Sequence, residues 1–365
     1  MGYQNSENRS VIMMVIGSLG AGGKERQLIL HLKTLKEQQR YLTILTVLNP
    51  DGTREKEAAE YADELIKIDR SFKYNLFSAF FRLVVITKKN DVKLIHSWGS
   101  GVGDLISLLV AKWCHIPFLH NGIQSSPSIL NLSNKLSKLS ALFADVIVAN
   151  SNAGLSAFGL ENHPKAMVIY NGLDLNRFAH YSISQDYDYI CMVANFREEK
   201  DHKTMVRSLV DIRIAFPNIL LFLVGHDFGT LNTTERLVQE LELENHVKFI
   251  TNVLNPEPYV AQSKVCILAT HGEGISNVLL EYMALNKPII VSNNGGNPEV
   301  VLDGVNGYLV APQSPEALSS KVIELLKNKD LAIQMGIAGR KLVEDIFSKS
   351  KMASAFNNVY DKLQK

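Results

Sequence analysis

Short apolar, β-branched runs alternate with longer amphipathic segments from one end of the chain to the other. The runs are apolar on both faces, as strands of a parallel sheet must be when helices cover both of its sides. Six runs fall in each half of the chain, which predicts an α/β fold of two doubly wound, Rossmann-like domains rather than one continuous sheet. The predicted strands are residues 11–16, 43–48, 92–96, 117–119, 146–149 and 167–170, then 189–194, 220–224, 247–250, 265–269, 288–291 and 308–310.

The break between the two halves is predicted in residues 179–188, which are polar and follow no apolar period. The turn signal Asn171-Gly172 lies just before them. Near the end of the second half, Ser314 can cap a helix that has Pro315 at its first position. We therefore expect three parts: a first domain over residues 1–180, a second over residues 189–349, and an amphipathic helix in residues 350–365 that crosses back to the first domain.

The composition suits a globular chain and excludes several functional classes. A length of 365 residues fits about two domains, and a hydrophobic fraction of 46% is ample for two cores. The net charge of +1 provides no basic field for nucleic acid. The three cysteines are unclustered, so we expect no disulfide framework and no zinc site, and a reducing cytoplasm fits better. We see neither a signal peptide nor a membrane-spanning run.

The most informative motif, residues 270–281, follows a predicted strand. It predicts a glycine-bearing turn and the start of a helix, with Glu273 at the turn and Glu281 eight positions later. Eight helical residues make just over two turns, so both carboxylates can address the same side. Amide groups at the helix start would attract an anion into that space. Carboxylates for hydroxyls beside amides for phosphate suit a nucleotide-sugar.

The alternative for this motif is an ordinary helix with one acid favouring the macrodipole and a second acid in solvent. Glu281 argues against it, because its neighbours Leu280 and residues 282–284 are largely apolar and should be buried. A second charged loop, residues 194–203, follows the first strand of the second domain. Its cations Arg197 and Lys200 can neutralise a departing diphosphate, although a solvated charged loop is the favoured explanation when this loop is taken alone.

Two features of the first domain are weaker candidates for ligand contact. The glycine-rich turn of residues 17–23 fits neither the dinucleotide fingerprint nor a P-loop, so structural turning and ligand contact both stay open. His96 and His120 each end a predicted strand, where open α/β sheets bind ligands. A lone histidine at such a place is more often packed or hydrogen-bonded than catalytic.

One amphipathic segment, residues 132–143, is a candidate for contact with a membrane surface. Its leucines and Phe143 lie on one side, with Lys135 and Lys138 nearby. Such a helix can rest on an anionic membrane surface. The favoured interpretation is an ordinary helix that packs its apolar stripe inward.

Several of these segments together resemble landmarks of one enzyme family, in the same order. Residues 148–152 and 168–174 resemble the end of that family's first domain, and residues 193–202 its diphosphate-binding loop. The spaced glutamates and residues 291–299 match the next two landmarks. The chain therefore resembles a retaining glycosyltransferase of family 4, of the group 1, exopolysaccharide or lipid-linked-glycan type, and this resemblance implies the GT-B architecture.

The resemblance assigns roles in the second domain. Glu273 would contact hydroxyls of the donor sugar, and Glu281 would hold the nucleotide ribose. Lys200 looks like the family's diphosphate lysine. Arg197 would be its arginine, which many members carry at the position of Asn195. The rest of the implied donor site consists of Gly274, Ile275, Ser276, Asn277 and Val278, whose amides would face the diphosphate.

The resemblance also involves the first domain. Gly22 and Gly23 resemble the loop that reaches the donor, and His120 is the candidate for a histidine that the family often places over the sugar. No cofactor or metal is implied, because the nucleotide-sugar is a substrate. The implied donor is a UDP-sugar or, next, GDP-mannose, and the implied acceptor is a glycan or lipid-linked glycan. We expect a cytoplasmic protein at the inner face of the plasma membrane.

Two other functions remain open at the level of sequence. A GT-B nucleotide-sugar epimerase would share the fold and the donor cleft but would need acid and base groups for a free sugar intermediate; the spaced glutamates favour transfer. A non-catalytic nucleotide-sugar-binding subunit would not need Arg197, Lys200, Glu273 and Glu281 together.

Overall fold

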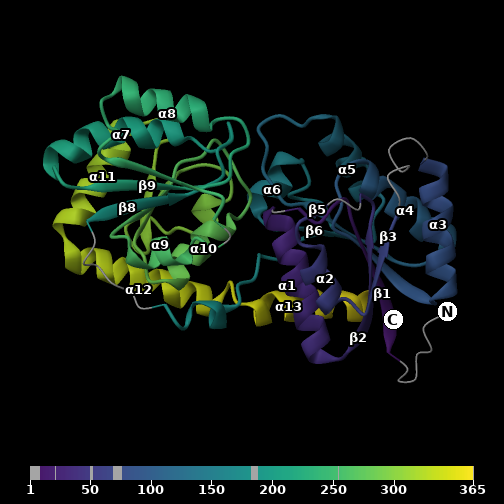
Figure 1. The fold of residues 1–365 in the computed structure, drawn as a ribbon. Helices are drawn as coiled ribbons and strands as arrows, with labels where there is room; N and C mark the ends of the chain where they lie inside the picture. The colour runs from purple at the N-terminus through teal and green to yellow at the C-terminus, as the bar shows by residue number, and fades with distance from the viewer. Residues whose placement is uncertain are drawn as a thin grey trace. The chain divides into compact units, whose positions relative to one another are not determined.

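The computed structural model describes residues 9–20, 22–49, 52–68, 76–181, 188–253 and 255–364. The chain divides into two compact units, each with its own sheet (Figure 1). Unit 1 is Met1–Gly172 together with Lys349–Lys365, and unit 2 is Leu173–Ser348. Both units are parallel sheets with helices, so the predicted fold class is confirmed.

Unit 1 is built on a seven-stranded sheet with the order β3-β2-β1-β4-β5-β6-β7. Every neighbouring pair is parallel. The central strand β1 is buried at every position after its first residue, because helices cover both faces of the sheet. The strands are β1 Ser10–Ile16, β2 Tyr41–Val47, β3 Glu64–Lys67, β4 Val92–Ser97, β5 Phe118–Ile123, β6 Val146–Ala149 and β7 Ala166–Val168.

The helices of unit 1 form two layers, each with its own core. One core contains Leu83 of α3, Ile106 of α4 and Ala141 of α5, and α4 lies between α3 and α5 (Figure 1). The other core contains Leu32 of α1 and Phe356 of α13. The helices are α1 Gly23–Gln38, α2 Glu55–Tyr61, α3 Leu76–Lys89, α4 Val102–Cys114, α5 Leu132–Leu142, α6 Asn152–Ala157 and α13 Lys349–Leu363.

Unit 2 is built on a six-stranded parallel sheet with the order β10-β9-β8-β11-β12-β13. Its strands are β8 Tyr189–Val193, β9 Leu220–Gly225, β10 Val247–Thr251, β11 Cys266–Leu268, β12 Ile289–Ser292 and β13 Gly307–Val310. Its helices are α7 His202–Ala215, α8 Leu231–Glu240, α9 Glu257–Gln262, α10 Asn277–Ala284, α11 Pro315–Lys327 and α12 Lys329–Asp345, with short 3-10 helices η2 Leu175–Phe178 and η3 Asn297–Glu299.

Local sequence signals explain where several helices begin. Ser314 caps α11 by accepting a hydrogen bond from the Ala317 N–H, and Pro315 is the first helical residue, as predicted. Asp201 caps α7 in the same way through the N–H of Thr204. The C-terminal helix is also where the amphipathic pattern predicted it.

The prediction of six strands per half was wrong for the first half. The missed strand, β3, has only two apolar residues between Glu64 and Lys67 and lies at the sheet edge, so it lacks the long apolar run of a central strand. Of the predicted linker, residues 182–187 lie outside the described residues. The units divide between Gly172 and Leu173 and again between Ser348 and Lys349. None of the helices in the described part of the chain is long and apolar enough to cross a membrane.

Candidate functional site

The candidate site of unit 2 lies in two loops that leave neighbouring strands. Residues 194–201 follow β8, and residues 269–276 follow β11, which is paired with β8. The chain proceeds from β8 to β9 on one side and places β11 on the other, so strand order reverses between them. In open parallel sheets, ligands bind beyond the carboxyl ends of the strands at such a reversal.

Hydrogen bonds tie these two loops together. The Asp201 N–H donates to the Ala269 carbonyl at 3.0 Å, and the His271 N–H donates to the Glu199 carbonyl at 2.9 Å. The Thr270 hydroxyl donates to the same Glu199 carbonyl at 2.8 Å. The backbone on either side of Lys200 and Glu273 is therefore fixed.

Lys200 and Glu273 form an ion pair between the loops. Both side chains are largely buried, with exposed fractions of 18% and 17%. Burial and the positive charge of Arg197 lower the pKa of the Lys200 ammonium to about 7. The sequence predicted that each residue would face a donor, but not that the two would face each other.

The loop after β12 forms hydrogen bonds with the loop that carries Glu273. The Gly296 N–H donates to the Glu273 carbonyl at 2.9 Å, and the Asn294 amide donates to the Thr270 carbonyl at 2.6 Å. These contacts give the loop after β12 a structural role.

Helix α10 starts directly after Glu273 and its glycine. Ser276 is the N-cap, in extended conformation, and Asn277 is the first helical residue. The segment from Gly274 to Val278 therefore contains the N-terminus of an eight-residue helix, the end that favours an anion.

Tyr282 fixes α10 against the point where β8 and β11 separate. Its buried hydroxyl accepts a hydrogen bond from the Val193 N–H at 2.6 Å and lies 3.3 Å from the Ile267 carbonyl. The side chain thus replaces a strand partner for Val193. Sequence analysis missed this residue, because its role depends on which strands separate.

Glu281, the second glutamate of the motif, is 4% exposed on α10. Arg177 of η2 lies beside it, with Nη2 at 3.4 Å from Oε1 of Glu281 and Nε at 2.9 Å from Oε1 of Glu257. The two carboxylates raise the pKa of Arg177 although burial opposes this. Arg177 therefore ties η2 to Glu281 of α10 and to Glu257 of α9. Arg177 and Glu257 belong to none of the motifs, so the sequence analysis missed them.

Arg197 and Asn195 both lie in the loop after β8 but point to different partners. The Arg197 guanidinium lies 4.1 Å from the ring centre of Phe228, and the Asn195 side chain accepts from the His226 N–H at 3.1 Å. Asn195 thereby joins its loop to the one after β9. Gly225 permits this approach, because a Cβ there would lie 2.1 Å from the Ala194 carbonyl oxygen.

A cavity of about 360 Å³ opens beside the loop after β8. Arg197 and Lys200 line it together with Lys203 and Arg207 of α7, so its wall carries four cations. Glu198 and Asp201 are the carboxylates of the lining. Across the described residues, no group of three or more His, Cys, Asp and Glu side chains is arranged to hold a metal ion.

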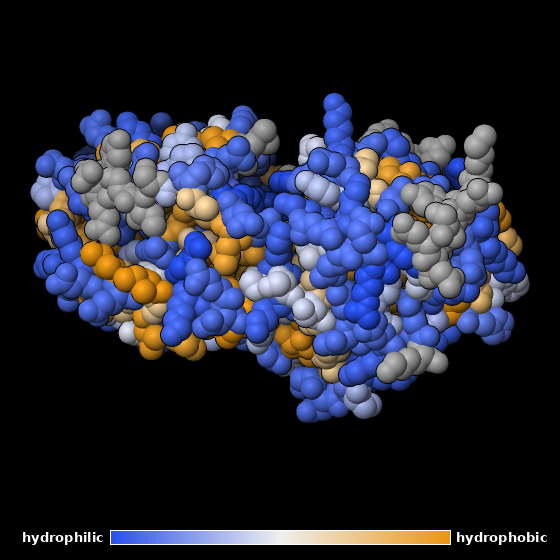
Figure 2. All heavy atoms as spheres, turned by 90° about the horizontal axis from the view of Figure 1, so that it is seen from below, coloured by the Kyte–Doolittle hydropathy of each residue, from blue (hydrophilic) through white to orange (hydrophobic). Residues whose placement is uncertain are grey.

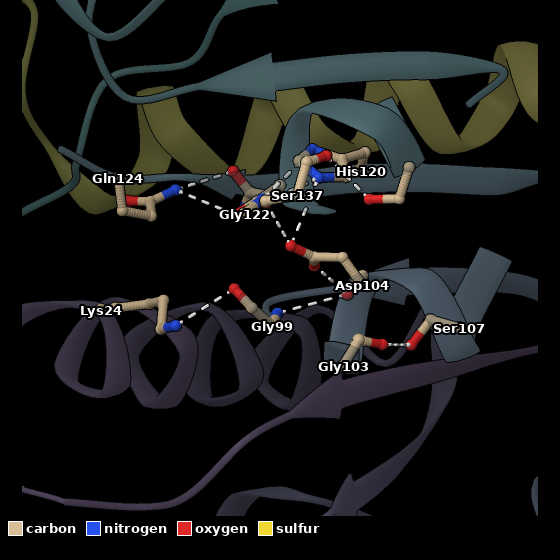
Figure 3. Close-up of polar contacts among 12 residues, drawn as sticks. Lys24, Gly99, Gly103, Asp104, Ser107, His120, Gly122, Gln124 and Ser137 are labelled. Atoms are coloured by element: carbon tan, nitrogen blue, oxygen red, sulfur yellow. Dashed lines mark hydrogen bonds and ion pairs between the residues drawn. The ribbon is translucent and has the colours of Figure 1, made fainter. Parts of the chain in front are cut away.

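Three predicted residues lie in unit 1. Gly22 is the N-cap of α1 and Gly23 its first residue, and both are exposed. A Cβ on Gly22 would meet the Glu25 side chain at 2.3 Å. The neighbouring Lys24 ammonium donates to the Gly99 carbonyl at 3.2 Å, which links α1 to the loop after β4 (Figure 3).

His120 on β5 is fully buried and belongs to a polar network (Figure 3). Its Nε2 lies 3.4 Å from Oδ2 of Asp104 and 3.3 Å from the Ser137 hydroxyl, and Ser137 donates to the same carboxylate oxygen. Ser97 donates to the other oxygen at 2.7 Å. The Asp104 and Ser137 side chains that contact His120 both belong to unit 1.

Asp104 is the centre of this network, and no motif in the sequence pointed to it. Burial alone would raise the pKa of its carboxyl, but His120 and the Ser137 and Ser97 hydroxyls outweigh burial and hold the pKa below its usual value. A Cβ on Gly122 would lie 2.5 Å from its Oδ2, so the end of β5 closes tightly over the carboxylate.

Residues 176–342 match the family model described as glycosyl transferases group 1. This stretch, which is less than half of the chain, is similar to group 1 glycosyltransferases. The match begins at η2, just before Arg177, and spans both loops and α10. The candidate site therefore lies entirely within the matched residues.

Two curated proteins that are similar to part of this chain carry informative names. An N-acetyl-alpha-D-glucosaminyl L-malate synthase of Bacillus anthracis is 31% identical over 49% of this chain and 47% of its own length. A GDP-mannose-dependent alpha-(1-6)-phosphatidylinositol monomannoside mannosyltransferase of Mycolicibacterium smegmatis is 28% identical over 54% of this chain and 57% of its own. The chain thus spans about half the length of these relatives.

A solved structure extends the likeness to the whole chain. The Anabaena protein HepE, in complex with UDP and glucose, superposes with a TM-score of 0.85 at 18% identity, over 97% of this chain and 100% of its own. This likeness shows the GT-B fold.

Proposed function

We propose that the protein is a retaining glycosyltransferase of family 4. It moves a sugar from a nucleotide-diphosphate sugar to a hydroxyl of a glycan or lipid-linked glycan acceptor in bacterial surface polysaccharide synthesis. A UDP-sugar is the first choice of donor, since HepE is similar over the whole chain and was solved with UDP and glucose. GDP-mannose is the second choice, after the mycobacterial mannosyltransferase.

The observation that carries this proposal is the Lys200–Glu273 pair at the strand reversal, directly before the N-terminus of α10. A cation, a carboxylate and a helix N-terminus within one pair of loops offer partners for a diphosphate and for sugar hydroxyls. On donor binding, Lys200 would turn to the diphosphate and Glu273 would be released to accept from the sugar. The ion pair is then the resting arrangement of both groups.

The remaining residues support this donor site. Glu281, which Arg177 positions through an ion pair, would accept from the ribose hydroxyls. The segment Gly274 to Val278 would face the diphosphate, with Arg197 completing the positive charge. Gly22 and Gly23 would come from unit 1 to the donor. Asn195 and His120 would act through the backbone that they hold, because their side chains already have partners within their own units.

The proposed reaction needs no cofactor. The bond from the sugar C1 to the phosphate oxygen breaks, and its electron pair stays on the diphosphate. The acceptor oxygen bonds to C1 from the same face, and its proton passes to the departing phosphate oxygen. Lys200, Arg197 and the amides of α10 stabilise the charge that grows on the diphosphate, which is the main contribution expected from the protein. The expected location is the cytoplasmic face of the plasma membrane, where nucleotide-sugars meet lipid-linked acceptors.

The test is a panel of UDP-, GDP-, ADP- and TDP-sugars, scored by thermal shift and by slow donor hydrolysis. One nucleotide class should stabilise the protein and release its sugar. Glu273→Ala and Lys200→Ala should abolish release, whereas Lys321→Ala, which breaks an exposed ion pair in α11, should not. Release of the sugar with inverted configuration would refute retention, and epimerised nucleotide-sugar would indicate the epimerase. Stabilisation without any turnover would indicate a binding subunit.

A further inference from the structure

The solvent side of α3 is unusually apolar for a surface helix. Ala79, Leu83 and Val84 point into the core of unit 1, as an amphipathic helix requires. The opposite side nevertheless carries Phe77, Phe81 and Val85, which are 78%, 56% and 62% exposed. These three residues are spaced by four and therefore form a stripe along the helix.

The stripe continues onto α4, which packs beside α3. Phe80 makes the connection, because its ring centre lies 5.3 Å from that of Phe81 and 5.9 Å from that of Trp113. Trp113 and Leu109 of α4 are 59% and 49% exposed. Two helices thus share one exposed aromatic cluster.

Helix α5 extends the apolar area on the other side of α4. More than half of the exposed large apolar side chains among the described residues lie on α3, α4 and α5 or beside their ends, including Leu132, Leu139, Leu142 and Phe143 of the α5 segment. In the view of Figure 2, the surface is mostly hydrophilic and apolar areas gather in a few patches. Large exposed patches on a protein mark contact with another partner.

The exposed charges of these three helices are of one sign. The cations are Arg82, Lys88, Lys89, Lys112, Lys135 and Lys138. The acid within the helices is Asp104, which is fully buried. Asp145, which follows α5, lies 3.6 Å from Lys112 and offsets one of the cations. The helices that carry the exposed apolar side chains therefore also carry exposed cations.

We infer that the exposed surface of α3, α4 and α5, the α3–α5 surface, binds an anionic lipid membrane. Exposed aromatic side chains insert into the interfacial region, and lysine and arginine attract acidic headgroups. Among membrane-facing residues, tryptophan favours the level of the headgroups, which suits Trp113 at the end of α4. The α3–α5 surface has both the exposed aromatic side chains and the cations that such binding requires.

A second copy of the chain fits the same surface less well. A symmetric dimer places the same patch on both sides of the interface, so the cations of one copy would face those of the other. Such like-charge contacts oppose association, whereas acidic headgroups neutralise them. The charge pattern therefore favours the membrane.

This inference does not depend on the proposed function, since it concerns attachment and not turnover. It does add to it, because a protein attached through unit 1 would work at the surface where lipid-linked acceptors lie. A failure of membrane binding would leave the donor-site tests unaffected, and a failure of those tests would leave the vesicle result standing.

The experiment mixes the full chain with vesicles of phosphatidylcholine, or of phosphatidylcholine and phosphatidylglycerol in equal parts. The protein should sediment with the anionic vesicles, and added salt should weaken the binding. Lipids brominated on the acyl chains should quench tryptophan fluorescence. The chain has two tryptophans, and Trp98 is 1% exposed, so Trp113→Phe should remove the quenching while binding persists.

Variants locate the contact. Phe77→Ser and Phe81→Ser should each weaken vesicle binding about tenfold, because each removes a large apolar side chain from the lipid. Arg82→Gln, Lys88→Gln and Lys89→Gln should each weaken it about fivefold. Ile214→Ser and Ile337→Ser, at exposed positions in unit 2, are matched controls and should bind as the parent does.

Other outcomes overturn the inference. Equal binding to neutral vesicles would refute the charge argument, and equal binding by the Phe81→Ser and Ile214→Ser variants would place the contact elsewhere. The protein could instead bind neither kind of vesicle and form a dimer in sedimentation equilibrium. If Phe81→Ser then abolished the dimer, this surface would be assigned to a second copy. A monomer that binds neither vesicle would refute both.

Discussion

The hydroxyl of Tyr360 lies 2.6 Å from Nε2 of His31. The same hydroxyl lies 2.8 Å from Nδ1 of His96, which is also 3.3 Å from the Trp98 N–H. Because Trp98 can only donate, Nδ1 of His96 is an acceptor, so Tyr360 donates to His96 and accepts from His31. Both histidines are then neutral, and this relay holds α13 against α1 and β4 in the core of unit 1.

The buried relay predicts acid lability. Burial lowers the pKa of His31 to about 3, far below its usual value near 6.5. The unfolded chain takes up this proton more readily than the folded one, so stability is full above pH 6.5 and falls as the pH drops below it. Between pH 7 and pH 5 the loss should be roughly 2 kcal/mol from this residue alone.

Thermal unfolding of unit 1, followed across this pH range, checks that loss. His31→Gln, which can still donate to Tyr360 but does not titrate, should flatten part of the pH dependence. His180→Gln, at an exposed position, should leave it unchanged. An unaltered profile in His31→Gln would show that other groups cause the acid lability.

Tyr282→Phe should destabilise unit 2 by about 1–3 kcal/mol, because the buried Val193 N–H loses its acceptor. Chemical denaturation measures this cost. Tyr259→Phe is a suitable control, since the hydrogen bond to Tyr189 involves the Tyr259 carbonyl and survives the change. If Tyr282→Phe unfolds like the parent, the hydroxyl is not an essential partner for β8.

Donor affinity should fall as the pH rises through the Lys200 pKa of about 7. The diphosphate prefers the charged ammonium, and above this pKa the free protein must first take up a proton. The dissociation constant should therefore increase up to roughly tenfold per pH unit. Titration calorimetry at several pH values measures it. Lys200→Arg keeps a permanent charge, so any binding that it retains should lose this dependence.

Asp104→Ala should destabilise unit 1 by roughly 3–5 kcal/mol, because it leaves several buried donors without an acceptor. Asp104→Asn preserves shape and an acceptor oxygen and should cost less. Denaturation curves compare the two variants. Equal stability of Asp104→Ala and the parent would mean that the network around His120 contributes little.

The sequence predicted the secondary structure of most segments better than it predicted their tertiary contacts. Apolar runs and helix caps are local, so most strands and the start of α11 could be derived from them. β3 could not, because a short edge strand is stabilised by its neighbour and not by its own pattern. Arg177, Glu257 and Tyr282 depend on strand order and on segments far apart in the chain. The same limit applies to His120, whose partners come from α4 and α5.

Because unit 1 needs Lys349–Lys365 as well as Met1–Gly172, unit 2 is in effect an insertion within it. The ribosome makes all of unit 2 before it makes α13. During synthesis, His31 and His96 therefore lack their partner Tyr360 while the 176 residues of unit 2 are added. Helix α13 completes unit 1, so a chain cut before α13 would lose the fold of unit 1 before it loses the fold of unit 2.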